Sequence, residues 1–312
     1  MRLLRRLLPL PAVVLGAAVL IFLLPRLAGV DTVRAVLRSR VAEAEPDPAV
    51  AARVAVELGL DRPLSEQFLR WLGHVLTGDL GLSYASRTPV APQLASALGV
   101  SAALTALALA LAAAIGIPAG VHAARRPGGL VDRVVTGASV LGVAVPDFIL
   151  APVLVLLLAV AVPLLPALGW GSPAHVVLPA LTLAAFPAAL AAQLTRAETA
   201  DVLTRQHIVL ARAKGLTDGV VLWRHGARLA LTAVTSLSGM FFAGLLSGAV
   251  VVEVVFAVPG LGRLLDDSVI GQDLPMLQAG LLAVVVVAVL ASVAAEALQL
   301  ALDPVARSSV QT

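Results

Sequence analysis

The chain has 312 residues, of which 59% are hydrophobic and 13% charged, and its mean hydropathy is +0.97. Soluble domains are typically about 45–50% apolar and about 25% charged, so this composition largely excludes a water-soluble enzyme and indicates an integral membrane protein. The absence of cysteine excludes disulfides and thiolate metal sites, and the net charge of +3, without a long basic block, is only a weak sign of nucleic-acid binding.

Windows without Asp, Glu, Lys or Arg mark the expected membrane spans, because a helix needs about 20 apolar residues to cross a bilayer. Asp147 is the only such residue between positions 134 and 195, and a cluster of prolines and glycines at 163–173 divides that stretch into two spans. The other windows are 7–25, 88–124, 229–252 and 274–295. The sequence therefore predicts an all-α membrane protein with six transmembrane helices.

The first window follows three arginines, as the apolar region of a secretory signal peptide does. Its 19 residues exceed the usual length of such a region, and no small-x-small cleavage site follows, so we expect a retained span within 1–29. Residues 30–94 form the expected small outside region. Within it, Asp47 before Pro48 and Gly59 after Leu58 predict the two ends of a short helix.

The distribution of Lys and Arg in short loops predicts the orientation. Segments 1–6, 122–133, 196–228 and 304–312 hold 13 basic residues, whereas the loops 166–174 and 253–273 hold only Arg263. Both termini are therefore expected in the cytosol. The five remaining spans form a core over 95–303, with a cytosolic loop at 196–228 and a cytosolic tail at 304–312.

Motifs for chemistry are scarce in this sequence. The single lysine, Lys214, does not stand in a Gly-Lys-Ser/Thr context, so the chain has no P-loop for ATP. None of the five histidines pairs with another at i, i+4, and no G-x-S-x-G elbow occurs. We expect no enzyme, although Ser and His residues of an intramembrane hydrolase can meet in space without such a signature.

Two carboxylates within or beside the spans are candidate functional groups, since ionisable residues at membrane depth are costly. Asp147 follows Pro146 in the third span and either lines a solute path or is a structural group satisfied by a neighbouring helix. Glu253, at the outer end of the fifth span, either belongs to a gate or is merely solvated. The candidate path and gate residues are Asp147, Glu253, Phe256, Pro259 and Gly260.

The segment 196–228 is the longest expected cytosolic loop, with six basic and three acidic residues. Two short amphipathic helices joined at Gly215 fit its sequence, because glycine readily takes the left-handed conformation that ends a helix. The loop either docks a cytosolic partner or lies at the membrane surface as an ordinary helix pair.

Three stretches of the sequence carry a family pattern. The first comprises Leu58-Gly59-Leu60-Asp61-Arg62-Pro63-Leu64, Trp71-Leu72-Gly73, Gly78-Asp79-Leu80-Gly81 and Pro89-Val90; the second is Ala211-Arg212-Ala213-Lys214-Gly215-Leu216; the third comprises Gly248-Ala249-Val250-Val251-Val252-Glu253, Phe256, Pro259-Gly260-Leu261-Gly262-Arg263-Leu264 and Leu302-Asp303-Pro304. In this order they resemble the permease subunits of ATP-binding-cassette importers, in the dipeptide, oligopeptide and nickel group.

The resemblance implies that Ala211–Leu216 is the loop that couples the permease to an ATPase. The family pattern is Glu-Ala-Ala, three residues, then Gly; Gly215 and Ala211 match it, whereas Val209 and Leu210 replace the Glu and the first Ala. It also implies a second permease subunit, two ATPase subunits that carry ATP-Mg, and an extracytoplasmic solute-binding protein. This chain would need no cofactor of its own.

The function that this resemblance implies is import of short peptides across the cytoplasmic membrane by alternating access. Within the family, a permease for a nickel chelate or another small solute is the alternative. Outside it, a secondary transporter would need coupling-ion sites at broken helices, for which Asp147 alone gives thin support.

Overall fold

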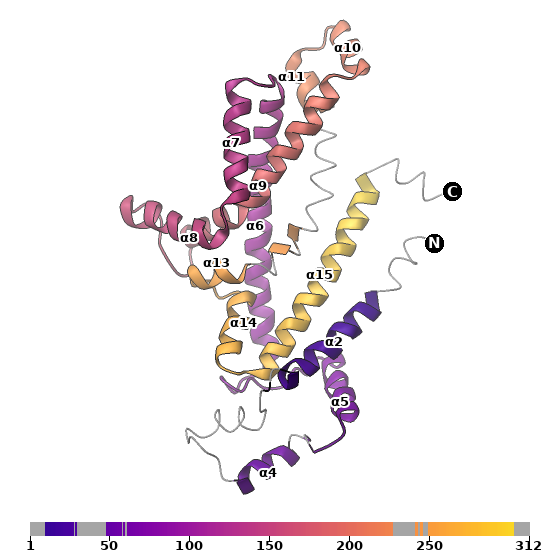
Figure 1. Ribbon diagram of the computed structural model, residues 1–312, viewed down its shortest axis with the longest axis vertical. Coiled ribbons are helices and arrows are strands. Elements are labelled where there is room, and N and C mark those ends of the chain that lie inside the picture. Colours follow the sequence, from indigo (N-terminus) through magenta and orange to yellow (C-terminus); the bar gives the residue numbers. More distant parts are fainter. Residues whose placement is uncertain are drawn as a thin grey trace, which may run out of the picture. The chain divides into compact units, whose positions relative to one another are not determined.

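The computed structural model describes residues 10–27, 29, 48–57, 59, 61–226, 241, 242, 244, 245 and 249–302 (Figure 1). Apart from a single antiparallel bridge between Leu82 and Pro89, every regular element in this described part is a helix. The α-helices are α2 (Leu10–Leu27), α4 (Pro48–Glu57), α5 (Leu64–Leu76), α6 (Val90–Ala124), α7 (Leu130–Ala144), α8 (Asp147–Val155), α9 (Pro173–Leu203), α10 (Gln206–Ala213), α11 (Asp218–Val220), α13 (Val250–Val255), α14 (Leu261–Ile270) and α15 (Leu274–Leu302). Two π-helical segments, η1 (Leu156–Ala161) and η2 (Val221–Gly226), complete the set.

The all-α membrane class is confirmed. Helices α2, α6, α9 and α15 are each long and apolar enough to cross a membrane, and the pair α7 and α8 provides a fifth crossing if it is one broken span. The predicted fifth span, 229–252, lies mostly outside the described residues. The total of six therefore stays a prediction.

The third predicted span is formed by two helices and not by a single continuous one. It is bent by 108° between α7 and α8, and Pro146 precedes α8 with extended backbone. Proline lacks an N–H and disfavours helical geometry in the residue before it, and Val145 is accordingly extended. Asp147 is therefore the first residue of a new helix and not a group in the interior of one.

Two other boundaries follow the sequence signals. The proline and glycine cluster forms the irregular connection 162–172, and α9 begins after Ser172 with Pro173 in its first turn. The short helix predicted between the first two spans is confirmed as α4, and Gly59 beyond its end has a left-handed φ of 66°.

The chain divides into two compact units, one of residues 1–100 with 259–289 and one of residues 101–258 with 290–312. In the first unit, the beginning of α6 packs on α14 and α15 through Val90, Leu261 and Met276. In the same unit, α2 packs on α15 through Ile21 and Leu282.

The second unit is held together by close approach of helices at small residues. A Cβ added to Gly116 would lie 2.5 Å from the Ala188 carbonyl oxygen, and one added to Gly120 would lie 2.9 Å from the Arg196 nitrogen. On α7, a Cβ on Gly142 would lie 2.9 Å from the Ala189 Cβ. Helix α9 is therefore in near-backbone contact with α6 and α7. The Gly116-x-x-x-Gly120 spacing, which marks such contacts in apolar helices, is a sequence signal that our predictions did not use.

Candidate functional site

The loop at 196–228 has the two-helix form that its sequence predicts. Helix α10 ends at Ala213, the backbone then turns at Gly215 with a φ of 84°, and α11 follows and runs on into η2. No atom of the residues that the structure describes lies within 4 Å of the position that a Cβ on Gly215 would take. The requirement for glycine here therefore comes from the left-handed backbone and not from crowding.

The inner side of the loop is anchored on the long helices of its unit. Ile208 of α10 and Val221 of η2 are fully buried against Val202 near the end of α9. Leu222 packs on Val121 of α6. This apolar packing positions the loop relative to α6 and α9.

The outer side of the loop is apolar and open. Lys214, Gly215 and Leu216 are exposed, and of the Ala211 and Arg212 side chains the structure gives no description. The large exposed apolar residues are Val209, Leu210, Leu216, Val220 and Trp223, which are between 39% and 62% exposed. Five large apolar residues exposed within fifteen positions are consistent with a surface for a partner or for the membrane.

An ion pair joins the first turn of α7 to α9 at the start of the segment 196–228. Both Arg196 Nε and Nη2 donate to the Asp132 carboxylate, the latter at 2.9 Å, and the Gly128 N–H donates to the same carboxylate at 2.7 Å. Asp132 is only 4% exposed. The bidentate geometry fixes the orientation of α7 relative to α9 at this point. The sequence does not reveal this pair, because 64 residues separate its members.

We expect the Asp132–Arg196 pair to stabilise the protein measurably. A double-mutant cycle with Asp132→Asn and Arg196→Gln should give a coupling energy larger than that of a fully exposed pair, because the two donor atoms of Arg196 and the Gly128 N–H converge on one carboxylate. The exposed pair Asp201–Arg205, with Oδ2 and Nη2 2.6 Å apart, is the control and should give about 0.5 kcal/mol or less. Thermal unfolding of the purified chain in detergent measures both cycles, and equal coupling energies would contradict the structural role.

Glu253 is buried and hydrogen-bonded. Its side chain is 0% exposed, and the Ser101 hydroxyl of α6 donates to its carboxylate. The solvated alternative for this residue is therefore wrong. Its backbone carbonyl accepts the Val258 N–H at 2.8 Å, and the buried Phe256 accepts the Gly169 N–H at 2.8 Å through its own carbonyl.

The other candidate path and gate residues are distributed over both units. Helix α8, which starts at Asp147, packs on α13, which holds Glu253. Asp147 is half-buried, and its carboxylate has no hydrogen bond or ion pair to any other residue that the structure describes. Pro259 and Gly260 belong to the other unit, where Gly260 precedes α14.

A carboxylate that the sequence predictions did not include organises the first unit. Asp273 is 3% exposed and accepts the Ser83 hydroxyl, the Tyr84 N–H at 3.0 Å and the Met276 N–H at 3.3 Å. It thereby caps the first turn of α15 and ties the loop before α6 to it. An Asp directly before an apolar helix with Pro275 in its first turn is a recognised start signal and could have identified this residue.

Comparison with known proteins covers nearly the whole chain. The family profile described as "binding-protein-dependent transport system inner membrane component" matches residues 116–308. The glutathione transport system permease protein GsiC of Salmonella paratyphi A (strain ATCC 9150 / SARB42) is 38% identical over 304 residues, 97% of this chain and 98% of that one. GsiC of Escherichia coli (strain K12) is 37% identical over 303 residues, 97% of each chain.

A solved structure shows the same fold over most of the chain. It is that of the MetNI methionine ABC transporter in inward-facing conformations, which superposes with a TM-score of 0.57 at 21% identity. The superposition covers 67% of this chain and 96% of that chain.

Proposed function

The chain belongs to the binding-protein-dependent transport system inner membrane components, as a permease subunit of an ATP-binding-cassette importer, and we propose that the solute it moves is a short peptide. It is a transport component and not an enzyme. The observation that supports a peptide is the 38% identity, along 97% of the chain, to permeases named for glutathione, which is itself a tripeptide. A nickel chelate or another small solute is the alternative.

The partners that we propose are a homologous second permease, two ATPase subunits with bound ATP-Mg, and an extracytoplasmic solute-binding protein. The loop supports the ATPase contact, because its inner side is anchored by Ile208 and Val221 while its outer side exposes Val209 and Leu210. ATP-driven closure of the ATPases would move this loop and open the path alternately to each side of the membrane.

The orientation that we propose has both termini in the cytosol and residues 30–94 outside. Because the chain has no cysteine, single cysteines report accessibility without background. Cysteines at Trp170 and Arg263 should react with a membrane-impermeant reagent from outside, and those at Arg126 and Lys214 only from inside. Labelling of position 214 from outside would overturn this topology.

Uptake by the whole complex in sealed vesicles tests the peptide proposal. Vesicles with all subunits and external binding protein should accumulate labelled glutathione or a dipeptide when ATP is inside, and unlabelled peptide should compete. A nickel chelate should neither accumulate nor compete. Accumulation of the chelate with no uptake of peptide would replace the proposed solute class by the alternative.

Asp147 provides a sharper test of peptide recognition. A carboxylate at the start of α8 can accept a charge-assisted hydrogen bond from the ammonium group of a peptide. We expect Asp147→Asn to keep the complex assembled but to lower the uptake of peptides with a free amino terminus about tenfold more than that of acetylated ones, since a hydrogen bond between charged groups contributes about 1.5–3 kcal/mol.

The exposed Asp61 is the matched control for this charge change, and Asp61→Asn should leave both uptake rates unchanged. Each variant is reconstituted separately into vesicles of the same composition, and uptake is compared at equal protein levels. If Asp147→Asn lowers the uptake of both peptides equally, Asp147 is a structural residue and not a recognition residue.

A further inference from the structure

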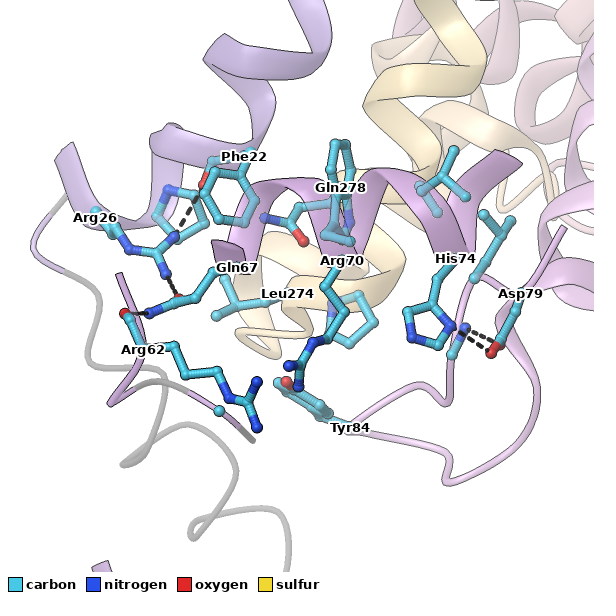
Figure 2. Close-up of a pocket in the computed structure, with 18 residues that line it drawn as sticks. Phe22, Arg26, Arg62, Gln67, Arg70, His74, Asp79, Tyr84, Leu274 and Gln278 are labelled. Atoms are coloured by element: carbon cyan, nitrogen blue, oxygen red, sulfur yellow. Dashed lines mark hydrogen bonds and ion pairs between the residues drawn. The ribbon is translucent and has the colours of Figure 1, made fainter. Parts of the chain in front are cut away.

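A pocket of about 500 Å³ lies within the first unit, and its lining includes no residue of the loop and none of the candidate path and gate residues. Its walls come from the end of α2, from α5, from residues 79–84 and from the beginning of α15. Figure 2 shows three arginines, Arg26, Arg62 and Arg70, around this space together with Tyr84. A pocket of this size accommodates a small ligand or a headgroup.

The arginines give the pocket an excess of positive charge. Arg62 and Arg70 share one carboxylate, Glu66, whose pKa is lowered mainly by its hydrogen bond from Arg62, so this trio carries a net charge of +1 at neutral pH. Arg26 donates to the Gln67 side-chain oxygen and to the Phe22 carbonyl, both of which are uncharged.

The negative charge at the other end of the pocket belongs to Asp79, whose carboxylate interacts with groups beside it in the chain. Asp79 Oδ2 lies 3.1 Å from His74 Nδ1, and its Oδ1 accepts the Gly81 N–H at 3.0 Å (Figure 2). The lining therefore presents guanidinium groups whose positive charge exceeds that of the carboxylates beside them. One guanidinium group can donate two parallel hydrogen bonds to the oxygens of a phosphate. Such hydrogen bonds between charged groups are stronger than those between neutral groups.

The pocket also lies where two membrane spans end. Arg26 is in the last turn of α2, and Leu274 begins α15. Leu15 and Val19 of α2, both exposed, precede Arg26 at spacings that place all three on one helix face. Phe22 and Trp71 also line the pocket, and their rings lie 5.7 Å apart. Aromatic residues are enriched where membrane spans meet the headgroup region.

We propose that this pocket binds the phosphate of an anionic phospholipid, whose acyl chains run along the Leu15–Val19 face of α2. The apolar stripe that leads to Arg26 favours a lipid over a soluble anion, since a free phosphate gains nothing from it. A bound lipid bridges α2, α5 and α15 and stabilises the region that lies between the first two spans.

Lipid binding to the purified full chain with its partner subunits tests this proposal. Phosphatidylglycerol and the zwitterionic phosphatidylcholine are titrated separately into the detergent-solubilised complex, and bound lipids are counted by native mass spectrometry. Phosphatidylglycerol should bind more tightly. The double variant Arg26→Gln/Arg70→Gln should weaken phosphatidylglycerol about tenfold or more, because it removes two charge-assisted contacts. Phosphatidylcholine should weaken less, because its choline cation already offsets the charge of its phosphate.

Arg53 of α4 is exposed and lies outside the pocket lining, so Arg53→Gln is the control with the same change of charge as the single variant Arg70→Gln, and it should bind like the native chain. Should Arg26→Gln disturb the α2–α5 contact, Arg70→Gln alone, at a side chain that is 46% exposed, still tests the site. Equal affinity for both lipids, or no loss in Arg70→Gln, overturns the proposal. Competition by glycerol phosphate at the affinity of the lipid also overturns it, because the pocket would then be a site for a soluble anion.

Discussion

Gly120→Val is expected to lower the folding equilibrium constant more than tenfold. A Cβ at this position would lie 2.8 Å from the Thr195 Cβ and 2.9 Å from the Arg196 nitrogen, and it would also overlap the Ala192 carbonyl oxygen. The backbone of α9 cannot yield as a flexible side chain does, so α6 and α9 must separate. Such overpacking destabilises by about 3 kcal/mol, and each ~1.4 kcal/mol is a tenfold change in the folding equilibrium.

Gly99→Val is the matched control, because Gly99 lies on the same helix and nothing stands within 4 Å of its added Cβ. It should yield nearly as much monodisperse protein as the native chain by size-exclusion chromatography, with a similar midpoint of thermal unfolding. If the two variants behave alike, the close α6–α9 contact does not determine stability. A merely local effect of valine in a helix would lower both by the same small amount.

Gly215→Val is expected to lower peptide uptake and substrate-stimulated ATP hydrolysis together, each by about tenfold. The φ of 84° strains a β-branched residue by about 1–2 kcal/mol, so α10 and the segment after it would no longer keep their relative geometry. The protein should still fold and insert, because no atom lies within 4 Å of the added Cβ.

Two further variants separate backbone geometry from added bulk. Gly219→Val adds the same side chain in α11, where the backbone is helical and no neighbour lies within 4 Å, and it should retain most activity. Gly215→Asn should recover a large part of the loss, because asparagine tolerates the left-handed region. Normal transport by a fully inserted Gly215→Val complex would refute a coupling role for this loop.

The sequence by itself determined the features that depend on local chemistry. The charge-free windows located α2, α6, α9 and α15, because twenty apolar residues have no favourable place except a membrane. Asp47, Pro48 and Gly59 predicted α4, and Gly215 predicted the turn in the loop, because caps and left-handed turns select residue types directly. The family pattern was equally readable, since its motifs are short and contiguous.

The tertiary structure alone decided which polar groups meet. Ser101 and Glu253 are 152 positions apart, and Ser83 and Asp273 are 190 positions apart. Local patterns cannot show that Glu253 is buried, because burial depends on the helices that fold over it. The bend before Asp147 likewise needed the structure, since a proline in an apolar stretch either kinks a continuous span or ends it. The outcome depends on whether the neighbouring helices pack better against one straight span or against two helices that run in different directions. In this protein the chain bends by 108° before α8, and α8 packs on α13.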